Sequence, residues 1–197
     1  MKPEMLWIDL ESTGLDARSE IPLELGLAVT DKLGNIIAEK SWLIHDDTAA
    51  FTLKVGAAQQ HSIVGPMHEK SGLWDDLANR EVHGYASIIE TDRRAVAWLE
   101  DLEVPRLPLA GNSIGSLDRP FILEHFPALN LSMHYRNIDI SSVKELCKLH
   151  NPRVYSLLGN ATGYKGKQEK HRVLDDIHDS INEYLYYLDN FLFQAED

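Results

Sequence analysis

Residues 5–11 read MLWIDLE, an apolar run that carries two carboxylates, Asp9 and Glu11. In a β-strand, residues two apart project from the same face, so these carboxylates would lie side by side while Ile8 and Leu10 point the other way. Two adjacent negative charges within an apolar strand are costly unless a cation lies between them. Mg²⁺ or Mn²⁺ would supply that charge, because both ions prefer oxygen ligands. For this pair taken alone, a solvated strand end is the simpler interpretation.

The remaining elements follow from local patterns in the sequence. Further strands are expected at residues 23–30, 36–44, 106–110 and 137–140, with a hairpin loop at residues 31–35. Helices are expected at residues 84–102, from about residue 119, from a cap at Ser141 or Ser142 to residue 150, and at residues 173–193. A hairpin followed by alternating helices and strands is typical of an α/β fold with a mixed central sheet. We therefore expect residues 1–197 to form a single domain.

The charge and composition of the chain narrow the classes of function. Its 197 residues carry 19 basic and 31 acidic side chains. This excess of negative charge argues against a protein that binds long nucleic acid through contacts to many phosphates. A local acidic site can still bind phosphate through divalent cations. No apolar run is long enough to span a membrane, and the single cysteine, Cys147, excludes an internal disulfide and fits a reducing compartment. We expect a cytoplasmic protein that does not bind membranes.

Two more segments carry side chains that could bind a metal. Residues 111–118 read GNSIGSLD directly after a predicted strand, and Asp118 is explained equally well as a metal ligand or as a helix cap. Residues 171–176 read HRVLDD at the start of the last predicted helix. Within a regular helix His171 would pair with Asp175, whereas on a preceding loop it would pair with Asp176. The polar residues 163–170 favour such a loop.

Taken together, these segments are far more specific than any one of them. Their order, Asp-x-Glu, Asp and His-x₄-Asp, resembles the four-acid exonucleases with a histidine in the RNase H-like superfamily. Within that superfamily the chain resembles the oligoribonuclease family over roughly residues 4–192. The matching segments are WIDLE at 7–11, TGLD at 13–16, HEKSGL at 68–73, GNSIG at 111–115, HYR at 134–136 and HRVLDD at 171–176.

The resemblance implies a fold, an activity and a set of site residues. It implies an RNase H-like fold and a 3′→5′ exoribonuclease that degrades short oligoribonucleotides, especially dinucleotides, to mononucleotides by two-metal-ion hydrolysis. Two divalent cations, Mg²⁺ or Mn²⁺, would be held by Asp9, Glu11, Asp118 and Asp176. His171 would be the general base. The substrate would be bound by Leu15 as a wedge between the bases, by Ser113, Arg136 and Ser141 at the 5′ phosphate, and by His68 and Tyr135.

The same resemblance implies a homodimer, in which Tyr135 reaches the partner's active site. Three features depart from the family's pattern. Residues 23–26 read LELG in place of the family's usual Ile-Glu-Ile-Ala, which matters only for packing. Ser116 and Leu117 separate Gly115 from Asp118, where the family usually has one residue. Residues 60–64 read QHSIV and lack the tryptophan that in the family can stack on a base. One stacking surface is therefore absent or supplied elsewhere, and the preference for dinucleotides is correspondingly relaxed.

Three alternatives differ from this interpretation. A related exonuclease acting on DNA or on tRNA 3′ ends would keep the chemistry, and only the resemblance of the HYR and SGL segments speaks against it. A catalytically inactive oligonucleotide-binding module is disfavoured because all four acids and the histidine are present. A zinc protein is disfavoured because Cys147 and His150 have no second pair at ligand spacing.

Overall fold

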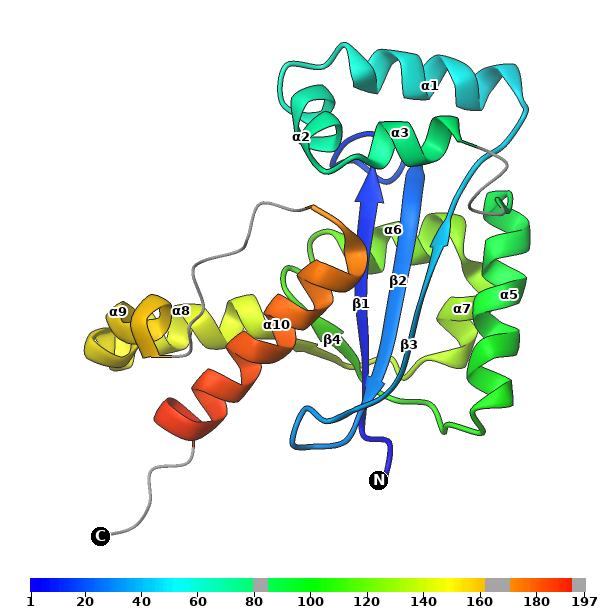
Figure 1. The fold of residues 1–197 in the computed structure, drawn as a ribbon. Coiled ribbons are helices and arrows are strands. Elements are labelled where there is room, and N and C mark those ends of the chain that lie inside the picture. The colour runs from blue at the N-terminus through cyan, green and yellow to red at the C-terminus, as the bar shows by residue number, and fades with distance from the viewer. Residues whose placement is uncertain (80–84, 162–170, 193–197) are drawn as a thin grey trace, which may run out of the picture.

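The structure is a computed structural model that describes residues 1–79, 85–161 and 171–192. Its centre is a five-stranded sheet in the order β3-β2-β1-β4-β5 (Figure 1). The strands are β1 (Met5–Ser12), β2 (Pro22–Thr30), β3 (Ile36–Leu43), β4 (Leu109–Gly111) and β5 (Asn137–Asp139). β2 pairs antiparallel with both β1 and β3, whereas β4 runs parallel to β1 and β5 runs parallel to β4. The predicted mixed sheet is confirmed.

The loop between β2 and β3 is the hairpin expected at residues 31–35. The Asp31 carboxylate accepts hydrogen bonds from the backbone N–H groups of Leu33, at 2.9 Å, and Asn35, at 3.0 Å. Gly34 has a φ of 73°, in a backbone region where glycine alone is free of steric cost. Because these bonds are local, the sequence was sufficient to predict the turn.

Helices cover both faces of the sheet and one end of it (Figure 1). One face carries α5 (Ile88–Asp101), α6 (Asp118–His125) and α7 (Pro127–Ser132). The other carries α8 (Ile140–His150), with α9 (Pro152–Ala161) against it, and α10 (Val173–Tyr187), which continues as the π-helical turn η1 (Leu188–Leu192). Three short helices, α1 (Ala49–Gln59), α2 (Val64–Lys70) and α3 (Leu73–Ala78), lie beyond the C-terminal end of β1. Within the described residues, no helix has the length and apolar character needed to cross a bilayer.

The side chains of β1 alternate between two apolar cores. Leu6, Ile8 and Leu10 are buried in the core beneath α5 and α6. Trp7 is buried in the core beneath α10, where its ring meets Tyr184 edge-to-face at 5.7 Å. By the same alternation, the carboxylates two and four residues after Trp7 project toward the face that α10 covers.

Two expected strand ends and one helix cap need correction. The strand expected at residues 106–110 is reduced to Leu109–Gly111, because Pro108 has no N–H to donate to a ladder. The strand expected at residues 137–140 ends at Asp139. Asp139 is also the cap of α8, since its carboxylate accepts the N–H of Ser141 at 3.0 Å. The expected cap at Ser141 or Ser142 is therefore wrong by two or three residues.

The existence of these helices was predicted more accurately than the residues at which they begin and end. The helix expected from residue 84 begins at Ile88, behind the cap Ser87, whose hydroxyl accepts the N–H of Glu90 at 3.3 Å. The last helix begins at Val173 as predicted, but its α-helical part ends at Tyr187. Residues 84, 163–170 and 193 lie outside the described residues. Helices α1, α2, α3, α7 and α9 were not predicted.

Candidate active site

A cavity of about 180 Å³ opens at the C-terminal end of β1. Its walls come from β1 and the turn that follows, from α2, from the residue before α6, and from the start of α10. Asp9, Glu11, Leu15, His171 and Asp176 are among the lining residues. Five of the side chains named by the sequence analysis, distant along the chain, therefore line one cavity.

Glu11, His171 and Asp176 form the tightest group of polar side chains in this cavity. One ligand-type atom from each lies within 4.8 Å of the other two. Glu11 is only 6% exposed and Asp176 only 4%. In the part of the chain that the structure describes, no other three side chains of ligand type converge in this way. Cys147 is instead buried in the core on α8, which disfavours the zinc alternative.

The start of α10 determines which aspartate faces His171. The helix begins at Val173, so His171 precedes it while Asp176 lies in its first turn. His171 has a φ of 44°, in the left-handed region that is uncommon for residues other than glycine. The structure therefore brings His171 together with Asp176, as expected if the histidine lies outside the helix. Asp175 is not a member of the group.

A glycine in β2 lets α10 approach the sheet closely. Gly26 lies opposite Asp9 in the β1–β2 register. A Cβ atom at position 26 would lie 2.6 Å from the Cβ of Val173, well inside the contact distance of two carbon atoms. Because Gly26 has no side chain, the first turn of α10 packs directly against the strands that carry the acids.

Asp118 is buried at the first position of α6, with 2% of its surface exposed. The cap position belongs to Leu117, which lines the cavity, and Asp118 lies in the first turn of α6, where the helix dipole favours a carboxylate. Its role as a metal ligand stays a prediction. The longer spacing before Asp118 is absorbed by a turn, in which the N–H groups of Ser116 (3.1 Å) and Leu117 (2.9 Å) both donate to the carbonyl of Ser113. Asp118 adjoins the cavity but is not a member of the three-residue group.

His68 lies beneath Glu11 and has no exposed surface. Its Nε2–H donates to the backbone carbonyl of Ser12 at 2.9 Å, and its Nδ1 faces Oε2 of Glu11 at 3.7 Å. Burial lowers the pKa of His68, an effect that the hydrogen bond to Ser12 partly offsets. The ring also meets Trp74 edge-to-face at 4.9 Å. The Nδ1 atom makes no hydrogen bond to Glu11 in this arrangement, and the substrate contact expected of His68 stays a prediction.

Ser113 and Ser141, both expected at a 5′ phosphate, lie next to each other. The backbone N–H of Ser113 donates to Oγ of Ser141 at 3.0 Å, and the two hydroxyl oxygens are 3.4 Å apart. The Ser141 hydroxyl in turn donates to Oδ1 of Asn112 at 3.1 Å. The turn after β4 and the start of α8 therefore present two hydroxyl groups together, outside the lining of the cavity.

Tyr135 and Arg136 lie on an exposed segment just before β5. The Arg136 guanidinium lies 5.3 Å from the ring centre of Tyr135, whose side chain is 75% exposed. Arg119 anchors the segment by donating to the carbonyl of His134 at 2.9 Å and to Oδ1 of Asn137 at 2.9 Å. Neither Tyr135 nor Arg136 lines the cavity in the single chain.

The surface available for stacking on a base is aliphatic. Leu15 lines the cavity and is 80% exposed, in keeping with its expected role as a wedge. Val64 and Met67 of α2 lie on the same cavity, in the region where the family's tryptophan is missing. Among the described lining residues none is phenylalanine, tyrosine or tryptophan.

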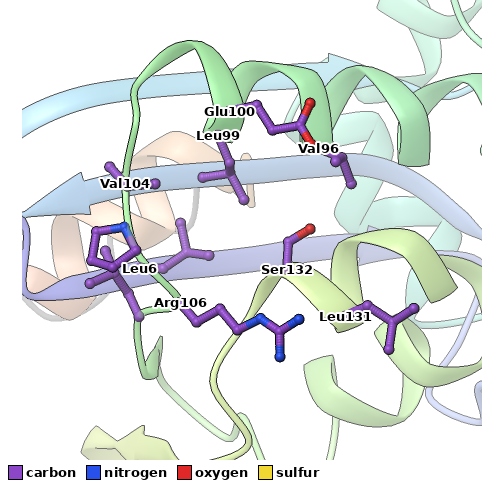
Figure 2. Close-up of a pocket in the computed structure, with 10 residues that line it drawn as sticks. Leu6, Val96, Leu99, Glu100, Val104, Arg106, Leu131 and Ser132 are labelled. Carbon is purple, nitrogen blue, oxygen red and sulfur yellow. The ribbon is translucent and has the colours of Figure 1, made fainter.

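A larger cavity, of about 320 Å³, lies near the start of β1 between α5 and α7 (Figure 2). Its wall is mostly apolar, with Glu100 and Arg106 as its charged members. Its described lining includes neither an aspartate nor a histidine. The smaller cavity at the other end of β1 is therefore the candidate active site.

Sequence reasoning noted Gly26 only as a difference in packing and assigned no role to Arg172, although both residues shape the site. The Arg172 side chain bonds to Glu24 and Asp76, which are 148 and 96 residues away along the chain. No spacing rule connects partners at such separations. The available signal was the position of Arg172 directly after His171.

Comparison with known proteins shows the family of the chain. Residues 6–184 match the sequence profile of a family described as exonuclease. The chain is 37% identical over 190 residues to the oligoribonuclease of Mycolicibacterium paratuberculosis, covering 95% of this chain and 80% of that protein. It is 38% identical over 186 residues to the oligoribonuclease of Nocardia farcinica, covering 93% of this chain and 78% of that protein.

Solved structures with the same fold include two forms of exonuclease I. The enzyme from Methylocaldum szegediense superposes with a TM-score of 0.69 at 16% identity, over 98% of this chain and 41% of that one. The E. coli enzyme, in a zinc-bound complex with single-stranded DNA, gives 0.67 at 14% identity, over 98% and 42%. The chain thus spans about two fifths of these proteins, and the likeness shows the fold alone. With the exonuclease profile and the curated relatives, it follows that the chain belongs to the oligoribonuclease family of 3′→5′ exoribonucleases.

Proposed function

We propose that the chain removes nucleotides from the 3′ ends of short single-stranded RNAs, dinucleotides among them, by hydrolysis that depends on two divalent cations. The observation that carries this proposal is the convergence of Glu11, His171 and Asp176 within 4.8 Å. Asp9 lines the same cavity. The products would be nucleoside 5′-monophosphates.

The acidic side chains are suited to holding divalent cations. Glu11 and Asp176 offer ligand atoms within 4.8 Å of each other and are 6% and 4% exposed, and carboxylates this buried and this close need positive charge nearby. Asp118 is 2% exposed at the start of α6. Oxygen ligands favour Mg²⁺ or Mn²⁺ over softer metals. We assign Asp9, Glu11, Asp118 and Asp176 as the ligands. Two such ions, when bound, would stabilise the attacking and the leaving oxygen at phosphorus.

The protein's own groups would supply proton transfer and orientation. His171 would take a proton from the attacking water, since a ring nitrogen lies within 4.8 Å of carboxylate oxygens of Glu11 and Asp176. Leu15 would separate the two terminal bases from its exposed position on the cavity. Ser113 and Ser141 would bind the 5′ phosphate with Arg136, whose planar guanidinium can donate to two phosphate oxygens. His68, which is buried next to Glu11, is assigned to the substrate site with these residues.

Short chains suit this protein better than long ones. With a net charge of −12 it lacks the basic surface that binds extended nucleic acid. The family resemblance implies a homodimer in which Tyr135 reaches the partner's substrate site, and Tyr135 and Arg136 lie on an exposed segment outside the cavity of their own chain. A free cysteine fits a cytoplasmic location.

Cleavage assays on 5′-labelled oligomers would test the proposal. RNAs and DNAs of two to seven nucleotides are incubated with Mg²⁺, Mn²⁺ or a chelator. We expect 3′-terminal shortening of RNA that requires metal and is fastest for the shortest chains. Equal rates on DNA, or on tRNA with a frayed 3′ end, would support the alternative exonuclease. Light scattering of the purified protein would report the expected dimer.

A further inference from the structure

Arg172 joins three parts of the fold at the edge of the candidate active site. Its Nε donates to Oε2 of Glu24 at 2.9 Å, and a terminal nitrogen donates to Oε1 of the same carboxylate at 3.1 Å. Its other terminal nitrogen donates to Oδ2 of Asp76 at 2.5 Å. One guanidinium thus links the start of α10, strand β2 and helix α3. These three residues are called the Arg172 clamp below.

The clamp is anchored next to a proposed metal ligand. Glu24 lies opposite Glu11 in the β1–β2 register, and only 4% of its side chain is exposed. The side chain of Arg172 is 26% exposed, and that of Asp76 28%. A two-pronged bond from arginine to a buried carboxylate fixes both distance and orientation, which a lysine in the same place does not do.

The clamp acts on the residue that directly precedes Arg172. His171 has a φ of 44°, a conformation that costs energy in a residue with a side chain and persists only where the surroundings enforce it. Arg172 has an extended backbone and is the cap residue of α10, without a side-chain cap bond. Its side-chain bonds to Glu24 and Asp76 therefore hold the backbone between His171 and the helix.

We propose that Arg172 is a positioning residue for His171. By binding Glu24 and Asp76 it holds the histidine in its strained conformation beside Glu11 and Asp176. Arg172 is not itself among the residues that line the cavity. The inference rests on the proposed function, because it takes His171 to be the general base.

A positioning role makes a prediction that a merely structural role does not. If Arg172 acts through His171, its substitution lowers kcat while KM for a dinucleotide hardly changes. The same substitution has no further effect once His171 has been removed. If Arg172 only stabilises the fold, the two substitutions lower kcat independently, and their effects multiply.

The test measures kcat and KM on a 5′-phosphorylated RNA dinucleotide at saturating Mn²⁺. Arg172→Lys is made in the unmodified chain and in His171→Ala, with Arg94→Lys as the control. Arg94 forms an exposed pair with Glu90 on α5, far from this site in the fold. We expect Arg172→Lys to lower kcat about 10- to 100-fold in the unmodified chain, as displacement of a catalytic group by roughly 1 Å does. In His171→Ala it should change kcat less than about twofold.

A second variant covers the case in which Arg172→Lys does not fold. Asp76→Asn weakens one arm of the clamp and leaves both bonds to Glu24, and it should lower kcat by a smaller factor with the same dependence on His171. An equal loss of kcat in both backgrounds, or no loss in either variant, overturns the proposal. Full activity of His171→Ala alone would instead overturn the assignment of the general base, so the two failures are distinguishable.

Discussion

Gly26 and Val173 are in such close contact that a methyl group added at position 26 would lie 2.6 Å from the Cβ of Val173. Gly26→Ala should therefore push α10 away from β2, lowering the free energy of unfolding by about 1–3 kcal/mol and displacing Asp176. We expect a lower kcat together with the lower stability. Thermal unfolding and dinucleotide kinetics on the same preparation would measure both.

A compensating change and a matched control sharpen this prediction. Gly26→Ala combined with Val173→Gly removes both Val173 atoms that a Cβ at position 26 would meet, so it should recover much of the lost activity. Gly56→Ala in α1 places the same methyl group where nothing lies within 4 Å, and should leave stability unchanged or raise it by about 0.5–1 kcal/mol. A fully active and stable Gly26→Ala protein would show that α10 is not seated by this contact.

Removing any one of the proposed metal ligands should abolish activity without unfolding the protein. Asp118→Ala is the most informative case, since Asp118 is buried beside the cavity but outside the three-residue group. Less carboxylate repulsion should make the metal-free variant at least as stable as the unmodified chain. Asp175→Ala is the matched control on the same turn as Asp176. Ordinary turnover of Asp118→Ala in Mn²⁺ would remove Asp118 from the ligand set.

His171→Ala should lower kcat about 10²- to 10⁴-fold, the usual contribution of a positioned general base. Divalent-metal binding, measured by calorimetry, should persist because the four carboxylates remain. His178→Ala is a suitable control, since His178 lies on the same helix but contacts Glu39 on β3, at 2.5 Å. A large loss in the control and none in His171→Ala would reassign the base.

Arg136→Ala should weaken a 5′-phosphorylated dinucleotide by about 1.5–3 kcal/mol, as expected for one charged hydrogen bond. A 5′-hydroxyl dinucleotide or a longer RNA should be affected much less. Dissociation constants in Ca²⁺ for RNAs of two to seven nucleotides would measure this. Arg153→Ala on α9 is the control, because Arg153 is exposed on another helix. Equal affinity across all lengths in the unmodified chain would contradict a specialised dinucleotide site.

Cys147 should be inert toward thiol reagents in the native protein. Its side chain is fully buried, and burial raises the pKa of the Cys147 thiol despite an opposing hydrogen bond from the backbone of Tyr155. A raised pKa means less thiolate at neutral pH, and the thiolate is the reactive form. Labelling with a chromogenic disulfide should appear only with unfolding in urea. Fast labelling without denaturant would place the thiol at the surface.

The parts of the fold that obey local rules could be predicted from the sequence. The side-by-side placement of Asp9 and Glu11 follows from the alternation of a strand. The choice of Asp176 over Asp175 followed once His171 was placed ahead of the helix. In contrast, α1 buries only Phe51 and Ala58, so its sequence carries little apolar periodicity to detect.

The prediction of the α8 cap was wrong for a different reason. Asp139 and Ser141 are both good cap residues, and the choice between them depends on where β5 ends, which is set by its pairing with β4. The Arg172 clamp depends in the same way on tertiary structure, because β2, α3 and α10 meet only in the folded chain.

The proposed ligands come from β1, from the start of α6 and from the first turn of α10. During synthesis the β1–β2–β3 hairpins leave the ribosome long before α10 does, and chains tend to fold from the N-terminus as they emerge. A nascent chain therefore carries Asp9 and Glu11 without His171 and Asp176 for most of its translation. The candidate active site is therefore complete only after nearly the whole chain has been synthesised and the helix containing residues 173–187 has docked.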